Sequence, residues 1–261
     1  MRYAVVFALL ALALAGSAAR AGPPVAAVEV YLALGLMALA IAYGMKRAGF
    51  AVEEACCRRR SALAAWVLLA PYRLLGWLAL GLLSRFDGEA AISRVAPDLA
   101  IGRRPSRAER RGLAGSGIGA VLDLCFEFPH PDWDSAGMAG RFVPILDGSP
   151  PSDRQFREAL GWIEASRAEG KAVLIHCAQG HGRSATVAAV VLCRIGLADD
   201  VDRAIELIRS ARPRARPSRE QRSAAVRFLA SIESVENAEG RAFPPAPPVE
   251  SKSRPKLSDD R

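Results

Sequence analysis

Three blocks of apolar residues fill the first third of the chain, and they differ in length and in the charges that they carry. Residues 25–43 are apolar apart from Glu29, and they have the length of a helix that crosses a bilayer. We therefore predict a transmembrane helix here. Residues 3–19 end in the small-x-small pattern Ala19-Arg20-Ala21, which is typical of signal peptide cleavage. At about 17 residues this block is also just long enough to span, so cleavage and retention both stay open.

The basic residues after the second block predict its orientation. Lys46, Arg47 and residues 58–60 come directly after it, and positively charged segments stay on the cytoplasmic side of a membrane. Both fates of the first block place residues 20–24 outside, so the prediction is the same for each. We expect the chain to lie in the inner, cytoplasmic membrane, with the rest of the chain beyond the membrane region facing the cytoplasm.

The third apolar block, residues 62–83, carries Pro71 and Arg73 in its middle, where a charge is costly in a bilayer. Basic residues flank it on both sides, and a crossing segment should not have two cytoplasmic-looking ends. We interpret it as lying in the membrane interface and take residues 1–83 as the membrane region. A third crossing, which would put the rest of the chain outside, is the alternative.

Short strands and amphipathic helices alternate over residues 86–235, which indicates an α/β domain. This length is sufficient for one hydrophobic core. The predicted strands are 92–101, a pair turning at Pro97-Asp98, and then 118–124, 141–146 and 172–175. The predicted helices begin at Ser106, Ser152, Ser184, Asp199 or Asp200, and Ser218. Glu109, Gln155 and Gln221 complete capping boxes for three of them.

Composition and charge give three further predictions, on the C-terminal tail, on nucleic acid binding and on disulfides. Residues 236–261 are rich in Pro, Ser, Lys and Glu without an apolar period, which predicts a disordered tail. The formal net charge is +8, but no recognised nucleic-acid module accompanies it, so we expect no nucleic acid partner. Outside the membrane region the cysteines are scattered at 125, 177 and 193, which indicates no disulfide framework.

The candidate catalytic residues lie in the stretch 171–184, KAVLIHCAQGHGRS. A buried strand is predicted to end at His176 and Cys177, a glycine-containing loop turns the chain, and an apolar helix comes next. Such a loop directs backbone N–H groups and the positive end of a helix to one point, which makes an anion site and favours the thiolate form of a cysteine. Arg183 adds a planar fork that can bind two oxygens of a phosphate.

The order His-Cys, two residues, Gly, two residues, Arg-Ser resembles the signature loop of the cysteine-dependent phosphatases, the protein tyrosine and dual-specificity superfamily. The predicted element order also resembles the compact dual-specificity fold, which implies a central, mostly parallel sheet flanked by helices. The resemblance implies a membrane-anchored phosphatase of bacterial type that needs no metal or other cofactor.

The resemblance also assigns roles to single residues. Cys177 would attack phosphorus, and Arg183 with the loop residues would hold the phosphate oxygens. Ser184 would hydrogen-bond the sulfur, and His176 would support the loop. Asp147 would donate the proton to the leaving oxygen, with Asp132 and Asp134 as competitors. The loop residues expected at the substrate are Ala178, Gln179, Gly180, His181 and Gly182, and for His181 a purely exposed position is equally open.

Cys125 follows an apolar strand in the context Asp123-Leu124-Cys125. This context resembles that of tensin-like lipid phosphatases, in which a cysteine can trap the catalytic sulfur as a reversible disulfide. Redox protection of Cys177 by Cys125 is therefore a hypothesis. A small buried thiol is the simpler interpretation.

The substrate class stays open between phosphorylated proteins and anionic phospholipids. Positions 178–182 lack the lysines that inositol-lipid enzymes of this superfamily often carry, which favours phosphotyrosine, and also phosphoserine or phosphothreonine, on proteins. The lipid alternative covers a phosphoinositide or phosphatidylglycerophosphate, which the membrane anchor would bring close. A rhodanese sulfurtransferase and a non-catalytic phosphate-binding scaffold are more remote alternatives.

Overall fold

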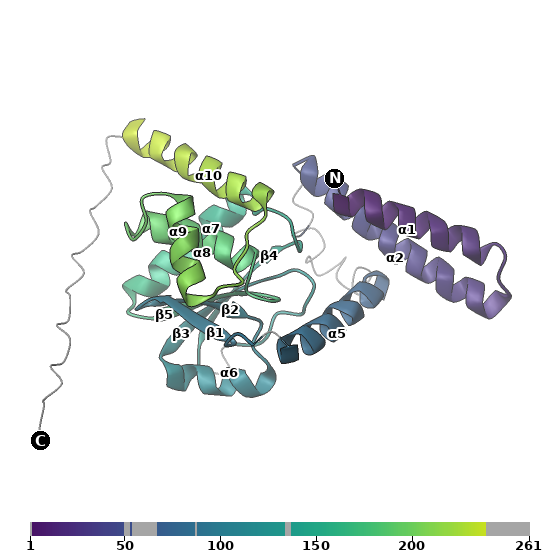
Figure 1. The fold of residues 1–261 in the computed structure, drawn as a ribbon, viewed down its shortest axis with the longest axis horizontal. Coiled ribbons are helices and arrows are strands. Elements are labelled where there is room, and N and C mark those ends of the chain that lie inside the picture. Colours follow the sequence, from purple (N-terminus) through teal and green to yellow (C-terminus); the bar gives the residue numbers. More distant parts are fainter. Residues whose placement is uncertain (1, 50–52, 54–66, 87, 134–136, 239–261) are drawn as a thin grey trace, which may run out of the picture.

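The computed structural model describes residues 2–49, 53, 67–86, 88–133 and 137–238. Within them, the strands form one sheet in the order β1-β2-β5-β3-β4, with β1 and β2 antiparallel and all other neighbours parallel (Figure 1). The predicted α/β fold with a mostly parallel sheet is confirmed. The strands are β1 (Ile92–Ala96), β2 (Leu99–Arg103), β3 (Ile118–Cys125), β4 (Ala139–Ile145) and β5 (Ala172–Cys177).

Helices cover both faces of the sheet, and this explains why the central strands β3 and β5 are apolar on both sides. On one face lies α6 (Arg107–Leu113), followed by the short 3-10 helix η1 (Ala114–Ser116) (Figure 1). The other face carries α7 (Asp153–Ala168), α8 (Arg183–Arg194), α9 (Val201–Ala211) and α10 (Arg219–Ala238). The larger core lies under these four helices and includes Phe156, Ile163, Val190 and Phe228.

The predicted capping boxes are present at the helix starts. Ser152 and Gln155 exchange side-chain and backbone hydrogen bonds at the start of α7. Ser106 with Glu109, and Ser218 with Gln221, make the same reciprocal contacts before α6 and α10. These caps fix where each helix begins, and the first turn of α10 lines the cavity that contains Cys177.

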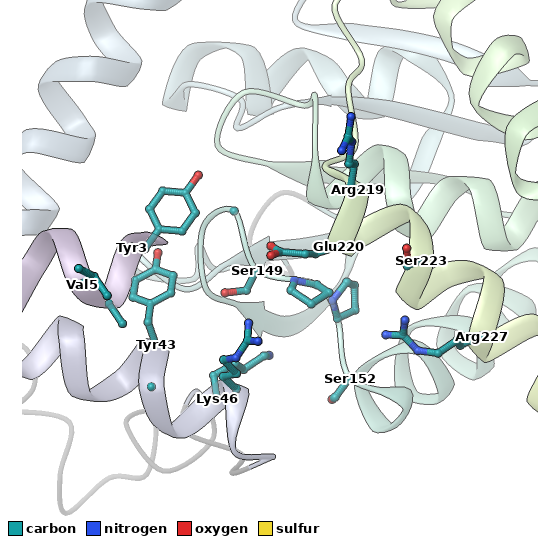
Figure 2. Close-up of a pocket in the computed structure, with 16 residues that line it drawn as sticks. Tyr3, Val5, Tyr43, Lys46, Ser149, Ser152, Arg219, Glu220, Ser223 and Arg227 are labelled. Atoms are coloured by element: carbon teal, nitrogen blue, oxygen red, sulfur yellow. The ribbon is translucent and has the colours of Figure 1, made fainter. Parts of the chain in front are cut away.

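The first two apolar blocks form an antiparallel pair of helices, α1 (Arg2–Ala18) and α2 (Pro23–Arg47), which we call the membrane hairpin (Figure 1). In the part of the chain that the structure describes, α2 is long and apolar enough to cross a membrane, and α1 is apolar but shorter. The hairpin end that carries Tyr3, Tyr43 and Lys46 lies beside the loop of Ser149 in the α/β domain (Figure 2).

The third block becomes helix α5 (Ala70–Phe86), and residues 62–66 of the predicted block lie outside the described residues. Pro71 falls in the first turn of α5, where its missing N–H costs little. The Trp77 ring lies 4.7 Å from that of Phe128, and Tyr72 joins an apolar cluster with Leu146. This helix therefore packs against the α/β domain, and its position relative to a membrane stays a prediction.

At the other end of the chain, α10 continues to Ala238, so residues 236–238 of the predicted tail are helical. The rest of that tail, residues 239–261, lies outside the described residues.

Candidate active site

The loop of residues 178–182 connects the end of β5 to the start of α8, as the sequence predicts. Gly180 has a φ of +78°, and a Cβ atom there would lie 2.4 Å from the Gly102 carbonyl carbon of β2. Only glycine fits this position, since any side chain would require both a strained backbone and a displaced strand. The glycine brings the loop backbone over Cys177.

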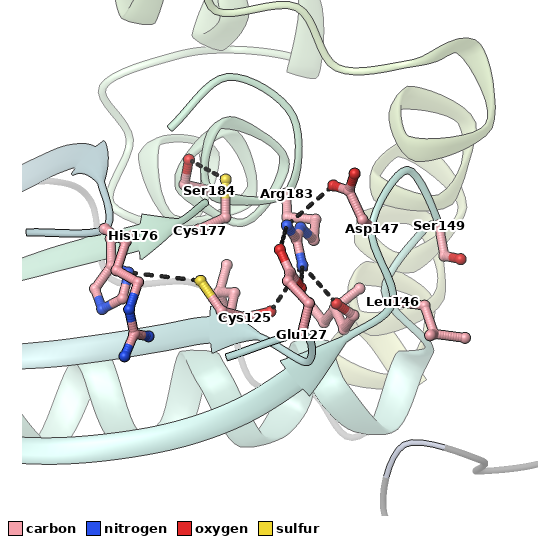
Figure 3. Close-up of polar contacts among 12 residues, drawn as sticks. Cys125, Glu127, Leu146, Asp147, Ser149, His176, Cys177, Arg183 and Ser184 are labelled. Carbon is pink, nitrogen blue, oxygen red and sulfur yellow. Dashed lines mark hydrogen bonds and ion pairs between the residues drawn. The ribbon is translucent and has the colours of Figure 1, made fainter. Parts of the chain in front are cut away.

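Cys177 is buried at the bottom of this loop, and its sulfur accepts a hydrogen bond from the Gly180 N–H at 3.2 Å. The Ser184 hydroxyl lies 3.5 Å from the same sulfur (Figure 3). The first turn of α8 adds the positive end of the helix dipole. The sulfur is thus surrounded by a backbone N–H, a hydroxyl and a helix N-terminus.

Arg183 is buried and held in a fixed orientation by a partner that the sequence analysis missed (Figure 3). Its Nη1 donates to Glu127 Oε2 at 2.8 Å and to the Ile145 carbonyl at 2.8 Å, while Nη2 donates to Glu127 Oε1 at 2.5 Å. Burial disfavours the guanidinium charge, but the Glu127 carboxylate holds the pKa of Arg183 well above its usual value. The arginine is therefore charged at any physiological pH.

Asp147 follows β4, and its carboxylate points toward Arg183 (Figure 3). Asp147 Oδ1 lies 3.0 Å from Arg183 Nη2, and the side chain is 64% exposed. Asp132 does not line the cavity that contains Cys177, and Asp134 lies outside the described residues. Of the two candidate carboxylates that the structure describes, Asp147 is the one that lines the cavity of Cys177.

A cavity of about 830 Å³ opens above the loop. Asp147 and Gly148 line one side, and Arg216, Arg219 and Gln221 line another. Helix α1 contributes the remaining wall through Tyr3 and Val6. The predicted residues in the wall are Cys177, Ala178, Gln179, His181, Gly182 and Arg183, whereas His176, Gly180, Ser184 and Cys125 do not line it.

His176 lies fully buried behind the loop, in contact with residues of β3. Burial lowers the pKa of His176 to about 4, so the imidazole is neutral at pH 7. Its Nδ1 lies 3.9 Å from Cys125 Sγ, and its Nε2 lies 3.7 Å from Asp123 Oδ1. Burial, and then the charge of Asp123, raise the pKa of the Cys125 thiol well above its usual value.

One group of side chains in the described part of the chain has the spacing of metal ligands. It consists of Asp123, Cys125 and His176, whose ligand atoms lie within 4.8 Å of one another. The Asp123 carboxylate is already compensated, because Arg104 Nη1 donates to it at 3.2 Å and the Cys125 N–H donates to it at 2.9 Å. The carboxylate of the cluster is thus satisfied by protein donors, whereas the buried Nε2 atom of His176 has no hydrogen-bond partner.

Two further residues fix the loop, and neither was among the predicted site residues. Arg212 is buried and donates to the carbonyl oxygens of Gln179 and Gly180 at 2.8 and 3.0 Å. Glu89 Oε2 lies 2.9 Å from His181 Nε2, so His181 is a paired side chain at the cavity wall, 19% exposed. The Arg212-Pro213 pair was a usable sequence signal, whereas nothing in the local pattern pointed to Glu89 or Glu127.

A buried cysteine between a central parallel strand and a helix N-terminus, with a carboxylate-held arginine in the same loop, defines a cysteine-dependent phosphatase of the α/β class. The comparison with known families agrees. Residues 91–235 match the family described as "PTP-SAK: Swiss Army Knife protein, DSP-PTPase phosphatase domain", and the chain belongs to that family.

Relatives and solved structures support the same assignment. The mouse protein "Dual specificity phosphatase 28" is 29% identical over 161 residues, which are 60% of this chain and 92% of the relative. The crystal structure of a mutant form of Tk-PTP is 31% identical, with a TM-score of 0.51 over 55% of this chain and 97% of that one. The structure of PTPMT1 in complex with PI(5)P shares the fold at 20% identity and a TM-score of 0.51, over 56% of this chain and 99% of that one.

The family and the fold together identify the chain as a cysteine-dependent phosphatase of the dual specificity type. The predicted superfamily is thereby confirmed. The bacterial type stays a prediction, as do the individual roles of the site residues.

Proposed function

We propose that the chain is a membrane-anchored phosphatase that hydrolyses phosphate monoesters on proteins, above all phosphotyrosine, through a phosphocysteine at Cys177. The position of the Cys177 sulfur carries this proposal. It accepts the Gly180 N–H at 3.2 Å and lines the same cavity as Arg183 and Asp147. A nucleophile, a charge clamp and a proton donor thus meet in one cavity.

The first step transfers the phosphoryl group to the enzyme. The Cys177 thiolate attacks phosphorus, the S–P bond forms, and the bond from phosphorus to the leaving oxygen breaks. Asp147 gives its carboxyl proton to that oxygen, so the product leaves as a neutral alcohol or phenol. Arg183 and the amides of residues 178–182 hold the remaining phosphate oxygens while charge develops on them.

The second step releases phosphate. The Asp147 carboxylate takes a proton from water, whose oxygen attacks phosphorus while the S–P bond breaks and the electron pair returns to sulfur. Ser184, 3.5 Å from the sulfur, stabilises the departing thiolate. His176 supports the loop from behind as a buried neutral imidazole, and His181 contacts the substrate from the cavity wall.

The composition of α2 supports membrane anchoring, and Lys46 and Arg47 at its end support a cytoplasmic position for the phosphatase domain. The packing of α1 along α2, with Tyr3 at the cavity, supports retention of the first block instead of its cleavage. We assign residues 1–83 to the membrane region and 86–235 to the phosphatase domain.

Phosphorylated proteins are the favoured substrates because residues 178–182 carry no lysine for a polyphosphorylated headgroup, and because the named relatives are dual specificity phosphatases. An anionic phospholipid is the second candidate. The cavity wall made by Tyr3 and Val6 favours it, since a substrate that enters beside an apolar helix can come from the bilayer.

Phosphate release by the full chain in lipid nanodiscs tests this proposal. We expect fastest release from a phosphotyrosine peptide, slower release from a phosphoserine peptide and the slowest from a short-chain phospholipid with a terminal phosphate. Faster release from the lipid would replace the favoured substrate by the second candidate. Release from none of the three would support the scaffold alternative, and thiocyanate formation from thiosulfate and cyanide would support a sulfurtransferase.

Cys125 is proposed as a redox partner of Cys177, because it ends the strand β3 that pairs with β5. Mild peroxide treatment should convert the two thiols to a disulfide and block activity, and a thiol reductant should restore it. Peptide mass mapping of the oxidised protein checks this. Oxidation of Cys177 to sulfinic acid, without any Cys125–Cys177 link, would contradict the proposal.

A further inference from the structure

Residues 146–148, which we call the acid loop, are each contacted by residues from the membrane region. Leu146 is fully buried in an apolar cluster with Leu39 and Ala42 of α2 and with Leu69. The Leu146 N–H donates to Glu53 Oε1 at 3.3 Å. Both the side chain and the backbone of the first loop residue are thus held from outside the α/β domain.

Asp147 is held through its backbone. The Tyr43 hydroxyl, near the end of α2, donates to the Asp147 carbonyl oxygen at 2.7 Å. The Tyr43 ring packs against the rings of Tyr3 and Phe7 of α1, with centroids 5.4 and 5.7 Å away. Because two aromatic neighbours fix the ring, the hydroxyl has little freedom to leave the carbonyl.

Gly148 completes the contact on the other side of Asp147. It has a φ of +68°, and a Cβ there would lie 2.9 Å from the Tyr3 ring, so the loop approaches α1 as closely as a glycine allows. Figure 2 shows Tyr3 and Tyr43 side by side, facing the loop that continues to Ser149.

A buried charge pair joins the hairpin to the helix after the acid loop. Lys46 forms an ion pair with Glu53, whose side chain is 1% exposed, and also donates to Gln155 Oε1 at 3.0 Å. Gln155 caps α7 and donates to the Pro144 carbonyl at 2.6 Å, just before the loop. Burying these two charges is costly unless the geometry is kept, so the end of α2 has a defined position.

The Asp147 carboxyl, by contrast, is mostly exposed and touches Arg183. Its position therefore depends on the backbone that carries it. A proton donor must lie within hydrogen-bond reach of the leaving oxygen, and small displacements of such a group reduce the rate strongly.

We infer that Tyr43 is a positioning residue for Asp147, so that the membrane hairpin is a working part of the active site in addition to an anchor. This inference rests on the proposed role of Asp147 as proton donor. It assigns to the hairpin a function in the steps that use Asp147, because the hairpin contacts described above are made with the acid loop.

The test compares two substrates in the full chain, embedded in nanodiscs. A phosphoserine peptide has a poor leaving oxygen that needs the proton, whereas p-nitrophenyl phosphate has a good one that does not. Tyr43→Phe should lower kcat/KM, which reports the first step, about tenfold for the peptide and less than about twofold for p-nitrophenyl phosphate. The ratio of the two kcat/KM values does not depend on the fraction of folded enzyme, so a partly unfolded variant still gives an answer.

Tyr31→Phe is the matched control. Tyr31 lies in the same helix and donates to the Val67 carbonyl at 2.5 Å, away from the acid loop. Its replacement should leave the ratio unchanged. An equal loss on both substrates for Tyr43→Phe, or a ratio unchanged from wild type, would overturn the inference.

Asp147→Asn separates this inference from the proposed function. In that variant the ratio should already be shifted, and adding Tyr43→Phe should shift it no further, since both changes act on one step. A further shift would show that Tyr43 acts independently of Asp147 and would overturn the inference. If Asp147→Asn leaves the ratio unchanged while Cys177→Ser is inactive, the proton donor assignment and the inference fail together, but the phosphatase mechanism stands.

Discussion

Replacing Cys177 by serine is expected to reduce phosphate release by about 10⁴-fold or more, because the reaction loses its nucleophile. A serine hydroxyl is a far weaker nucleophile at neutral pH than a thiolate, and the adjacent His176 does not line the cavity. His176 faces β3 instead, with its Nδ1 3.9 Å from Cys125 Sγ. Initial rates on a phosphotyrosine peptide measure the effect.

The same variant should still bind phosphate, since Arg183 and the loop amides are unchanged. Protection of its thermal unfolding by phosphate or vanadate, compared with wild type, checks this. Cys193→Ser is the matched control, because Cys193 lies in α8 and packs against the core away from the cavity. Turnover by Cys177→Ser within tenfold of wild type would contradict a phosphocysteine intermediate.

The catalytic loop could be predicted from the sequence because its parts are neighbours along the chain. The strand, the two glycines and the arginine of residues 172–183 each leave a local signal, and their spacing alone defines the loop. The capping boxes at Ser106, Ser152 and Ser218 are local for the same reason. The order of strands and helices in the domain could be predicted from these signals.

The partners of the loop could not be predicted in this way. Glu127 reaches Arg183 only because β3 pairs with β5, and Glu89 reaches His181 across the domain. Both are carboxylates in ordinary sequence surroundings, where a solvated surface position is the usual outcome. The contact between Tyr43 and Asp147 is even harder to predict from the sequence, since it joins an apolar helix to a distant loop of the α/β domain.

The apolar blocks show a second limit of prediction from sequence. Hydropathy predicts which segments suit a bilayer, but it does not tell whether one end of a helix also packs on a soluble domain. Tyr72 and Trp77 belong to the block that we expect in the membrane interface, yet their rings contact the α/β domain through the cluster around Leu146 and through Phe128. These two aromatic residues thus serve protein packing.

Arg183→Lys is expected to lower kcat by about 10³-fold, because a point charge cannot replace the planar guanidinium. Two parallel hydrogen bonds to Glu127 and one to the Ile145 carbonyl orient the group toward the cavity, and lysine cannot form this set. The phosphate oxygens carry more charge in the transition state than in the bound substrate. We therefore expect kcat and kcat/KM to fall together, as measured with a phosphotyrosine peptide.

Two comparisons separate a lost charge clamp from a damaged fold. Arg194 lies in the same helix, and its Nε forms a partly exposed ion pair with Glu164 Oε1 at 3.9 Å. Arg194→Lys should therefore leave kcat and kcat/KM near those of wild type. Glu127→Gln keeps the shape of the partner but leaves a buried guanidinium poorly compensated, so it should lower the free energy of unfolding by about 3 kcal/mol in addition to reducing kcat. If Arg183→Lys keeps more than a tenth of the wild-type kcat, the transition-state charge is stabilised elsewhere, and the loop amides of residues 178–182 would then be the main clamp.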